Sequence, residues 1–140
     1  MRSKFITVVA AGTLLLTGCA SSTAPASESR ECIEVPEAVM SAIAEGANAY
    51  PITPIAAAGV RSESFDDVTV IAMSFTPPDG KETTATWAIG GTVDQPGLTL
   101  AVDAMAQAVT DWPGQINGSA LDATEDGVAE AQSCLSDLSK

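Results

Sequence analysis

Two runs of β-favouring residues, 67–76 and 81–91, enclose the Pro-Pro-Asp-Gly sequence of residues 77–80 and constrain the fold more than any other feature. Proline and glycine between two such runs are typical of a turn, because glycine adopts positive φ without steric cost. The first run is apolar at almost every position, which predicts a strand covered on both faces. In the second run apolar residues alternate with threonine, which predicts one buried and one exposed face. We therefore expect the domain to be built around an antiparallel hairpin.

Segments with helical spacing of apolar residues flank this hairpin. Residues 36–48 begin with a proline suited to a first helical turn. The alanines of residues 53–63 would also suit a helix, but two prolines and a glycine favour an extended segment. After the hairpin, residues 98–113 and 121–140 both show helical periodicity. We predict an α+β fold: an antiparallel meander of three to four strands, with one N-terminal and two C-terminal helices packed on one face.

The N-terminal segment predicts export. A positively charged tip precedes an apolar run of twelve residues, 5–16, which is shorter than the roughly 20 residues of a membrane-spanning helix. The run ends in Leu16-Thr17-Gly18-Cys19, which resembles the lipobox of bacterial lipoproteins. The resemblance implies that signal peptidase recognises Leu16, Thr17 and Gly18, and that Cys19 is lipidated and becomes the mature N-terminus. An ordinary signal peptide with an incidental cysteine is the alternative.

Cleavage before Cys19 would divide the chain into three parts. Residues 1–18 are the expected lipoprotein signal peptide, residues 19–33 the lipidated cysteine with a flexible tether, and residues 34–140 a single domain. The tether is rich in serine, alanine and proline and has almost nothing to bury. Each buried methylene contributes about 0.8 kcal/mol, so two or three acyl chains, palmitate among them, would hold the protein on a membrane. We expect a lipid-anchored protein on the extracytoplasmic face of the cell membrane.

The chain is strongly acidic, with 18 acidic and 6 basic residues and a formal net charge of −12. Removal of residues 1–18 takes away Arg2 and Lys4 and no acid, which moves the charge to −14. Without clusters of lysine and arginine such a surface repels phosphates, which excludes nucleic acid as a partner. The acids are scattered along the sequence, which favours a role in solubility. A cationic or metal-bearing partner is the alternative.

Three cysteines are present. With Cys19 lipidated, Cys32 and Cys134 remain as an even pair in an exported chain, which predicts a disulfide. Cys32 precedes the first predicted helix and Cys134 lies in the last, so the bridge would join the two ends of the domain. A redox-active pair is the alternative, but the sequence lacks Cys-x-x-Cys spacing and a nearby basic residue that would stabilise a thiolate.

The chain contains no histidine, which removes the usual general base and the Ser-His-Asp constellation. Carboxylate pairs remain possible, since acid–base catalysis needs only two carboxyls with separated pKa values. Asp66 and Asp67 are the adjacent pair, but their polar context predicts a solvated turn. We therefore predict that the chain is not an enzyme and needs no cofactor.

The best metal candidate is the segment 122–133. Asp122, Thr124 and Asp126 occupy the first, third and fifth places of an EF-hand loop, but Ser133 stands where a bidentate glutamate is required. The same acids would favour the N-terminus of the last helix, where Asp122 and Glu125 have capping-box spacing. We therefore predict no metal site.

The aromatic residues are the remaining candidates for a site. Trp87 and Trp112 lie on predicted core faces and are expected to pack there. Alternatively, one of them lines a shallow groove with Tyr50 and binds a ligand or peptide.

Two segments carry a further resemblance. Trp87-Ala88, then the run 102–106 and Asp111-Trp112, look like the corresponding strand and helix of a group of small exported proteins from high-GC Gram-positive bacteria. The resemblance implies a lipoprotein on the outer leaflet that faces the cell wall, and it carries over no catalytic residue.

These observations predict a non-enzymatic domain that binds an envelope protein, a peptide or a wall component at the cell surface. A two-lobed solute-binding protein would need about twice this length. The alternative is a carboxylate-dependent hydrolase acting on wall polymers, which would need two acids roughly 5–9.5 Å apart in a cleft.

Overall fold

The computed structural model describes residues 30–140. A five-stranded antiparallel sheet forms its centre, with the strands side by side in chain order. Its strands are β1 (Ile33–Glu34), β2 (Thr53–Arg61), β3 (Val68–Thr76), β4 (Thr83–Thr92) and β5 (Gln95–Ala101). A separate small hairpin pairs β6 (Gln115–Ile116) with β7 (Ser119–Ala120). The predicted α+β meander is confirmed, and its sheet has five strands where the sequence indicated three to four.

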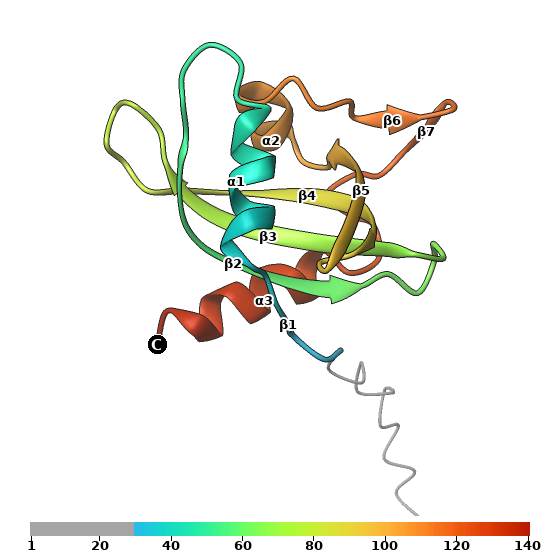
Figure 1. Cartoon of the computed structure of the whole chain (residues 1–140). Coiled ribbons are helices and arrows are strands. Elements are labelled where there is room, and N and C mark those ends of the chain that lie inside the picture. The colour runs from blue at the N-terminus through green and yellow to red at the C-terminus, as the bar shows by residue number, and fades with distance from the viewer. Residues whose placement is uncertain (1–29) are drawn as a thin grey trace, which may run out of the picture.

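Three helices cover the sheet on both faces, which corrects the expectation of a single covered face (Figure 1). They are α1 (Glu37–Glu45), α2 (Ala104–Val109) and α3 (Val128–Leu138). The helices α1 and α2 pack on the face that presents Ile71 and Trp87, whereas α3 packs on the face that presents Val70 and Ala88. Two covered faces are required because β3 is apolar on both sides and its residues 69–75 are all buried.

The face of β4 that carries threonine is buried, contrary to the expectation of an exposed face. Thr86 is fully buried beneath α3, and its Oγ1 accepts a hydrogen bond of 3.2 Å from Nε2 of Gln132. A threonine can occupy this position because its hydroxyl has a partner there. Of the predicted exposed residues Thr84, Thr86 and Ala88, only Thr84 is exposed.

The segment 98–113 is not one helix. Its first part completes β5, and α2 begins only at Ala104, where the side chain of Asp103 accepts a hydrogen bond of 2.8 Å from the backbone N–H of Ala106. An aspartate at this position satisfies one of the N–H groups that a helix start leaves unpaired. The N-cap therefore separates strand from helix within a continuous apolar pattern.

The folded domain begins before residue 34, where the sequence placed its boundary. Arg30 already forms an ion pair with Asp126, and Ile33 lies in β1. The last helix starts at Val128, after Gly127 with φ 93°, rather than near Asp122. A Cβ at Gly127 would lie 3.0 Å from Nη1 of Arg30, so both the backbone conformation and the space favour glycine there. Within residues 30–140, no helix has the length and hydropathy needed to cross a bilayer.

Candidate functional site

The residues predicted to direct lipidation, Leu16, Thr17, Gly18 and Cys19, lie outside the described part of the chain. The signal peptide and most of the tether lie outside it as well. Residues 30–33, the last part of the predicted tether, are described and belong to the fold.

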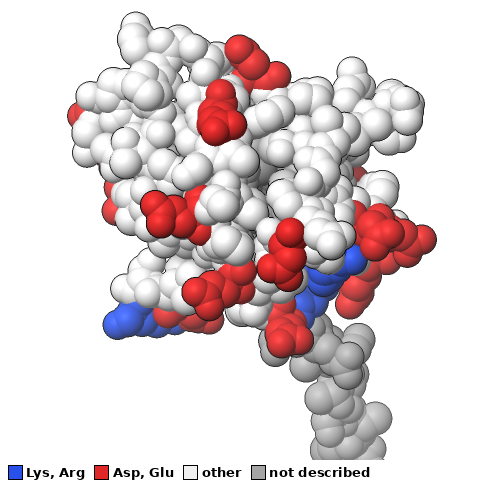
Figure 2. Space-filling model, in the orientation of Figure 1, with Lys and Arg blue, Asp and Glu red and all other residues white. Residues whose placement is uncertain are grey.

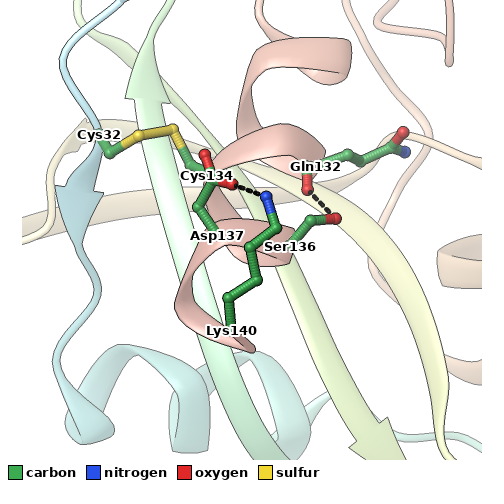
Figure 3. The surroundings of a disulfide bond; sticks show 6 residues. All are labelled: Cys32, Gln132, Cys134, Ser136, Asp137 and Lys140. Atoms are coloured by element: carbon green, nitrogen blue, oxygen red, sulfur yellow. Dashed lines mark hydrogen bonds and ion pairs between the residues drawn. A yellow bond between two sulfur atoms is a disulfide. The ribbon is translucent and has the colours of Figure 1, made fainter.

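A disulfide joins Cys32 and Cys134, whose Cα atoms are 5.7 Å apart (Figure 3). Cys32 immediately precedes β1, and Cys134 lies on α3, so the bond ties the N-terminal edge strand to the helix on the neighbouring face. Its two cysteines are separated by 102 residues. The bond therefore encloses nearly all of the described domain.

Trp87 is a core residue and lines no groove. Its side chain is fully buried, and its Nε1 donates a hydrogen bond of 3.2 Å to Oγ1 of Thr110. Its ring meets that of Phe75 edge-on, with centroids 5.9 Å apart and an interplanar angle of 66°. The indole N–H is thus satisfied inside the protein, as burial requires.

Trp112 is partly buried and joins α1 to the segment after α2. Its Nε1 donates a hydrogen bond of 2.9 Å to the carbonyl oxygen of Ile43. The indole lies directly over Gly46, where an added Cβ would be 2.1 Å from Nε1. Trp112 therefore fixes the end of α1 in place, and its indole N–H is already bonded within the protein.

Tyr50 is the most exposed of the three predicted groove residues, with 67% of its surface accessible. It lines a hollow of about 240 Å³ together with Asn48, Ile52, the prolines of the β3–β4 turn and the end of α2. The predicted groove is not formed, because the hollow beside Tyr50 is lined by neither Trp87 nor Trp112.

The acidic residues of the EF-hand-like segment point to different partners. Oδ1 of Asp122 accepts hydrogen bonds from the backbone N–H and the hydroxyl of Thr124, at 2.7 and 2.5 Å. These bonds stabilise the carboxylate and lower the pKa of Asp122 below its ordinary value of 3.8. Asp126 binds Arg30 instead. Asp122 and Glu125 form no capping box, because α3 begins later. No group of three or more His, Cys, Asp or Glu side chains with metal-binding geometry occurs in residues 30–140.

The adjacent acids Asp66 and Asp67 lie in the exposed connection between β2 and β3. Asp67 has φ 54° and forms a 3.5 Å ion pair with Arg61. The exposed position of both acids confirms the solvated turn predicted from the sequence.

An apolar hollow of about 340 Å³ lies beside the disulfide. It is bounded by β1 and the middle of β2, with Met40 from α1 and with Cys134 and Leu138 from α3. Leu138 is exposed, although its spacing places it on the apolar stripe of α3. This hollow is an uncovered part of the core at the short edge strand.

A third hollow is polar and lies between α3 and the turn end of the central hairpin. We call it the hydroxyl groove; it has a volume of about 390 Å³ and is lined by Ser74, Glu82, Thr84, Gln132, Leu135, Ser136 and Ser139. Two hydroxyls come from the sheet and two from the helix, and a single carboxylate lies among them. The groove can bind a polar ligand through several hydrogen bonds.

The sheet forms the floor of the hydroxyl groove. Ser74 on β3 pairs directly with Thr84 on β4, which brings their side chains to the same face. Ser74 is only 5% exposed, and its hydroxyl has no hydrogen-bond partner among the described residues. Because Ser74 lines the groove, this hydroxyl is available to a molecule that enters there.

The helix forms the opposite wall. Gln132 and Ser136 of α3 and Ser139 at its C-cap follow one another at intervals of four and three residues, so they lie on one side of the helix. The hydroxyls of Ser136 and Ser139 donate back to the helix carbonyls of Gln132 and Leu135. Figure 3 shows Gln132 extending away from the disulfide, toward the neighbouring strand. The polar spacing of these helix residues can be read from the sequence. That they face Ser74 and Thr84 of the sheet is shown only by the structure.

The face of the domain that Figure 2 shows is acidic. Figure 2 shows aspartate and glutamate side chains spread over the visible face, with few basic side chains among them. Such a surface attracts cations and repels anions at long range. No family model, no curated protein and no solved structure matches this chain.

Proposed function

We propose that this chain is a bacterial lipoprotein, anchored by acyl chains on Cys19, whose folded domain binds a partner in the cell envelope. The sequence Leu16-Thr17-Gly18-Cys19, directly after a short apolar run, is the observation that carries the proposal. A segment of serine, alanine and proline then links Cys19 to Arg30, the first described residue. This arrangement would keep the domain near the membrane surface and leave it free to reorient.

The disulfide between Cys32 and Cys134 supports an extracytoplasmic location. Disulfides form and persist in oxidising compartments outside the cytosol, whereas cytosolic thiols are kept reduced. The acidic surface is also compatible with a short tether, because negative charge holds the domain away from anionic headgroups.

The contents of the hollows support binding over catalysis. A carboxylate-dependent hydrolase needs two acids facing one cleft. Of the three hollows described above, the apolar one includes Glu34, the hydroxyl groove includes Glu82, and the Tyr50 hollow includes no acid. None of these three hollows therefore brings two carboxylates together. The chain also contains no histidine. We therefore favour the hydroxyl groove as the binding surface of a non-enzymatic domain.

Mass spectrometry of the protein isolated from its native membrane tests the anchor. We expect an N-terminus at Cys19 carrying acyl chains, and we expect Cys19→Ser to leave the membrane fraction or to retain its leader. The matched control is the double variant Cys32→Ser/Cys134→Ser, which also replaces cysteines but keeps Cys19 and is expected to remain membrane-bound. An unacylated N-terminus in the native protein would overturn the anchor.

Crosslinking in intact cells tests the binding role. We expect the native protein to capture an envelope component that Cys19→Ser captures poorly, because the anchor holds the domain beside its partner. Capture that is equal for both proteins would contradict a role that depends on anchoring.

A further inference from the structure

We infer that the hydroxyl groove binds a primary alkylammonium group, as found on a lysine side chain or a free aliphatic amine. This inference deepens the proposed binding role by naming the ligand chemistry, and it does not depend on the lipid anchor. The groove has the volume, about 390 Å³, to take an aliphatic amine of several carbons. Three features of its lining select an ammonium group over other ligands.

The first feature is the hydroxyl of Ser74. Ser74 is 5% exposed, lines the groove and makes no hydrogen bond within residues 30–140. Because Ser74 lines the groove, its hydroxyl oxygen can accept a hydrogen bond from a donor that enters there.

The second feature is an excess of acceptors. The Nε2 of Gln132 is committed to Thr86, which leaves its Oε1 to accept. The hydroxyl oxygens of Ser74 and Thr84 also accept, and the carboxylate of Glu82 forms no ion pair within the described part of the chain. An ammonium group has three donors and no acceptor, so it matches this set.

The third feature is electrostatic. The groove lies along the C-terminal half of α3, whose last turn has no basic residue and whose dipole favours a cation. Lys140, which follows the lining residue Ser139, forms a 2.6 Å ion pair with Asp137. Lys81 adjoins Glu82 in sequence but is exposed and forms no ion pair within residues 30–140. The charge of Glu82 thus remains available, and the acidic surface adds long-range attraction.

Other ligand classes fit less well. A calcium or magnesium ion requires several oxygen ligands, usually including more than one carboxylate, and Glu82 is the sole carboxylate among the described lining residues. An anion would meet Glu82 and the helix C-terminus, both of which repel it. Leu135 supplies an apolar contact for the methylene stem of an alkylamine.

Nuclear magnetic resonance of the full-length, isotopically labelled protein in detergent micelles tests this inference. The probe is Nα-acetyl-lysinamide, and its control is the Nε-acetylated form, which keeps the stem but loses the charge. Cadaverine provides a second arm, so that a lysine side chain and a free amine can be compared. We expect the charged probes to shift the backbone signals of Ser74, Thr84 and Gln132, and the acetylated control to leave them unchanged. Tighter binding in either arm identifies the source of the amine and supports the inference.

Two variants and a matched control identify the groups responsible. We expect Glu82→Gln to weaken binding about tenfold and Ser74→Ala to weaken it about threefold, as loss of a charged and a neutral hydrogen bond predicts. Glu45→Gln removes the same charge from α1 on the opposite face and is expected to change binding by less than about twofold, because long-range attraction is largely screened by salt. Glu82 is exposed, so Glu82→Gln should fold normally.

Two results would overturn the inference. One is the absence of shifts with both charged probes at millimolar concentration. The other is equal weakening by Glu82→Gln and Glu45→Gln, which would mean that the probe follows net charge rather than the groove. Mass spectrometry of Cys19 is unaffected by either result, so failure here is distinguishable from failure of the anchor.

Discussion

Arg30 and Asp126 are 96 residues apart in sequence and form an ion pair where the chain enters the domain. Their side chains are only 15% and 18% exposed. Oδ2 of the same carboxylate accepts hydrogen bonds from the backbone N–H of Ser64, at 3.1 Å, and of Glu63, at 2.5 Å, and from the hydroxyl of Ser62, at 3.3 Å. One aspartate therefore joins the N-terminal segment, the β2–β3 connection and the start of α3.

Asp126→Ala is expected to destabilise the domain by about 3 kcal/mol, because it leaves a partly buried guanidinium and several donors without an acceptor. The matched control is Asp137→Ala, which breaks the exposed ion pair with Lys140 and is expected to cost less than about 1 kcal/mol. Urea unfolding of both variants, with the disulfide intact, measures the difference. Equal losses would show that the Asp126 network has no special role.

The disulfide is expected to stabilise the domain by about 2–5 kcal/mol, because it closes a long loop in the unfolded chain. The separation of Cys32 and Cys134, 102 residues, is close to the full length of the domain. Guanidinium unfolding of the wild type and of Cys32→Ser/Cys134→Ser gives this value. We also expect the double variant to show a larger m-value, since its unfolded chain exposes more surface. An unchanged unfolding midpoint would contradict the prediction.

The two tryptophans are expected to differ in solvent access. In Trp112→Phe the remaining Trp87 is fully buried and should resist quenching by acrylamide. In Trp87→Phe the remaining Trp112 is partly exposed and should be quenched more readily. Neither signal should respond to an amine bound in the hydroxyl groove, which contains no tryptophan. Similar quenching in both variants would contradict the core position of Trp87.

Gly46 and Trp112 are expected to be energetically coupled. Gly46→Ala places a methyl where the indole lies, and overpacking of this kind costs about 1–3 kcal/mol. In a Trp112→Ala background the methyl has room, so the cost of Gly46→Ala should fall to about 0.5 kcal/mol or less. A double-mutant cycle by thermal or urea unfolding measures the coupling. Additive effects would mean that another contact excludes a side chain at position 46.

The carboxyl of Asp122 is expected to titrate below its ordinary value of 3.8, because the hydroxyl and backbone N–H of Thr124 stabilise its charged form. A folded-state pKa that is lowered stabilises the fold above the unfolded pKa, and this contribution is lost as pH falls through the folded pKa. Thr124→Ala should raise the pKa of Asp122 toward 3.8. Carbon-detected titration measures both values, and an unchanged pKa in Thr124→Ala would assign the shift to the backbone alone.

Local sequence patterns were sufficient to predict the central hairpin and the disulfide. The hairpin could be predicted because β3 and β4 are long, β-rich and separated by a turn sequence. The strand β5 could not be predicted, because Leu98 to Ala101 continue the apolar spacing of α2. Only the N-cap at Asp103 separates this strand from the helix. Pairing with β4, across the two-residue connection 93–94, decides that conformation.

Burial and the candidate groove depend on contacts that no local pattern specifies. Thr86 looks like a surface residue by composition, and it is buried because α3 crosses that face and Gln132 binds its hydroxyl. The hydroxyl groove depends on the register that sets Ser74 beside Thr84 and on the position of α3 above them. The tryptophans, as large aromatic residues, suggested a groove elsewhere. Both instead donate their indole N–H groups to acceptors within the protein.

The position of Cys32 also decides how the domain responds to mechanical load. The strand β1 has only two residues, and its pairing with β2 alone would peel away under a modest pull from the N-terminal side. The disulfide diverts that tension to α3 before it reaches the sheet. The chain between the two cysteines, which includes the sheet, α1 and α2, is thereby shielded from forces that a membrane attachment would transmit.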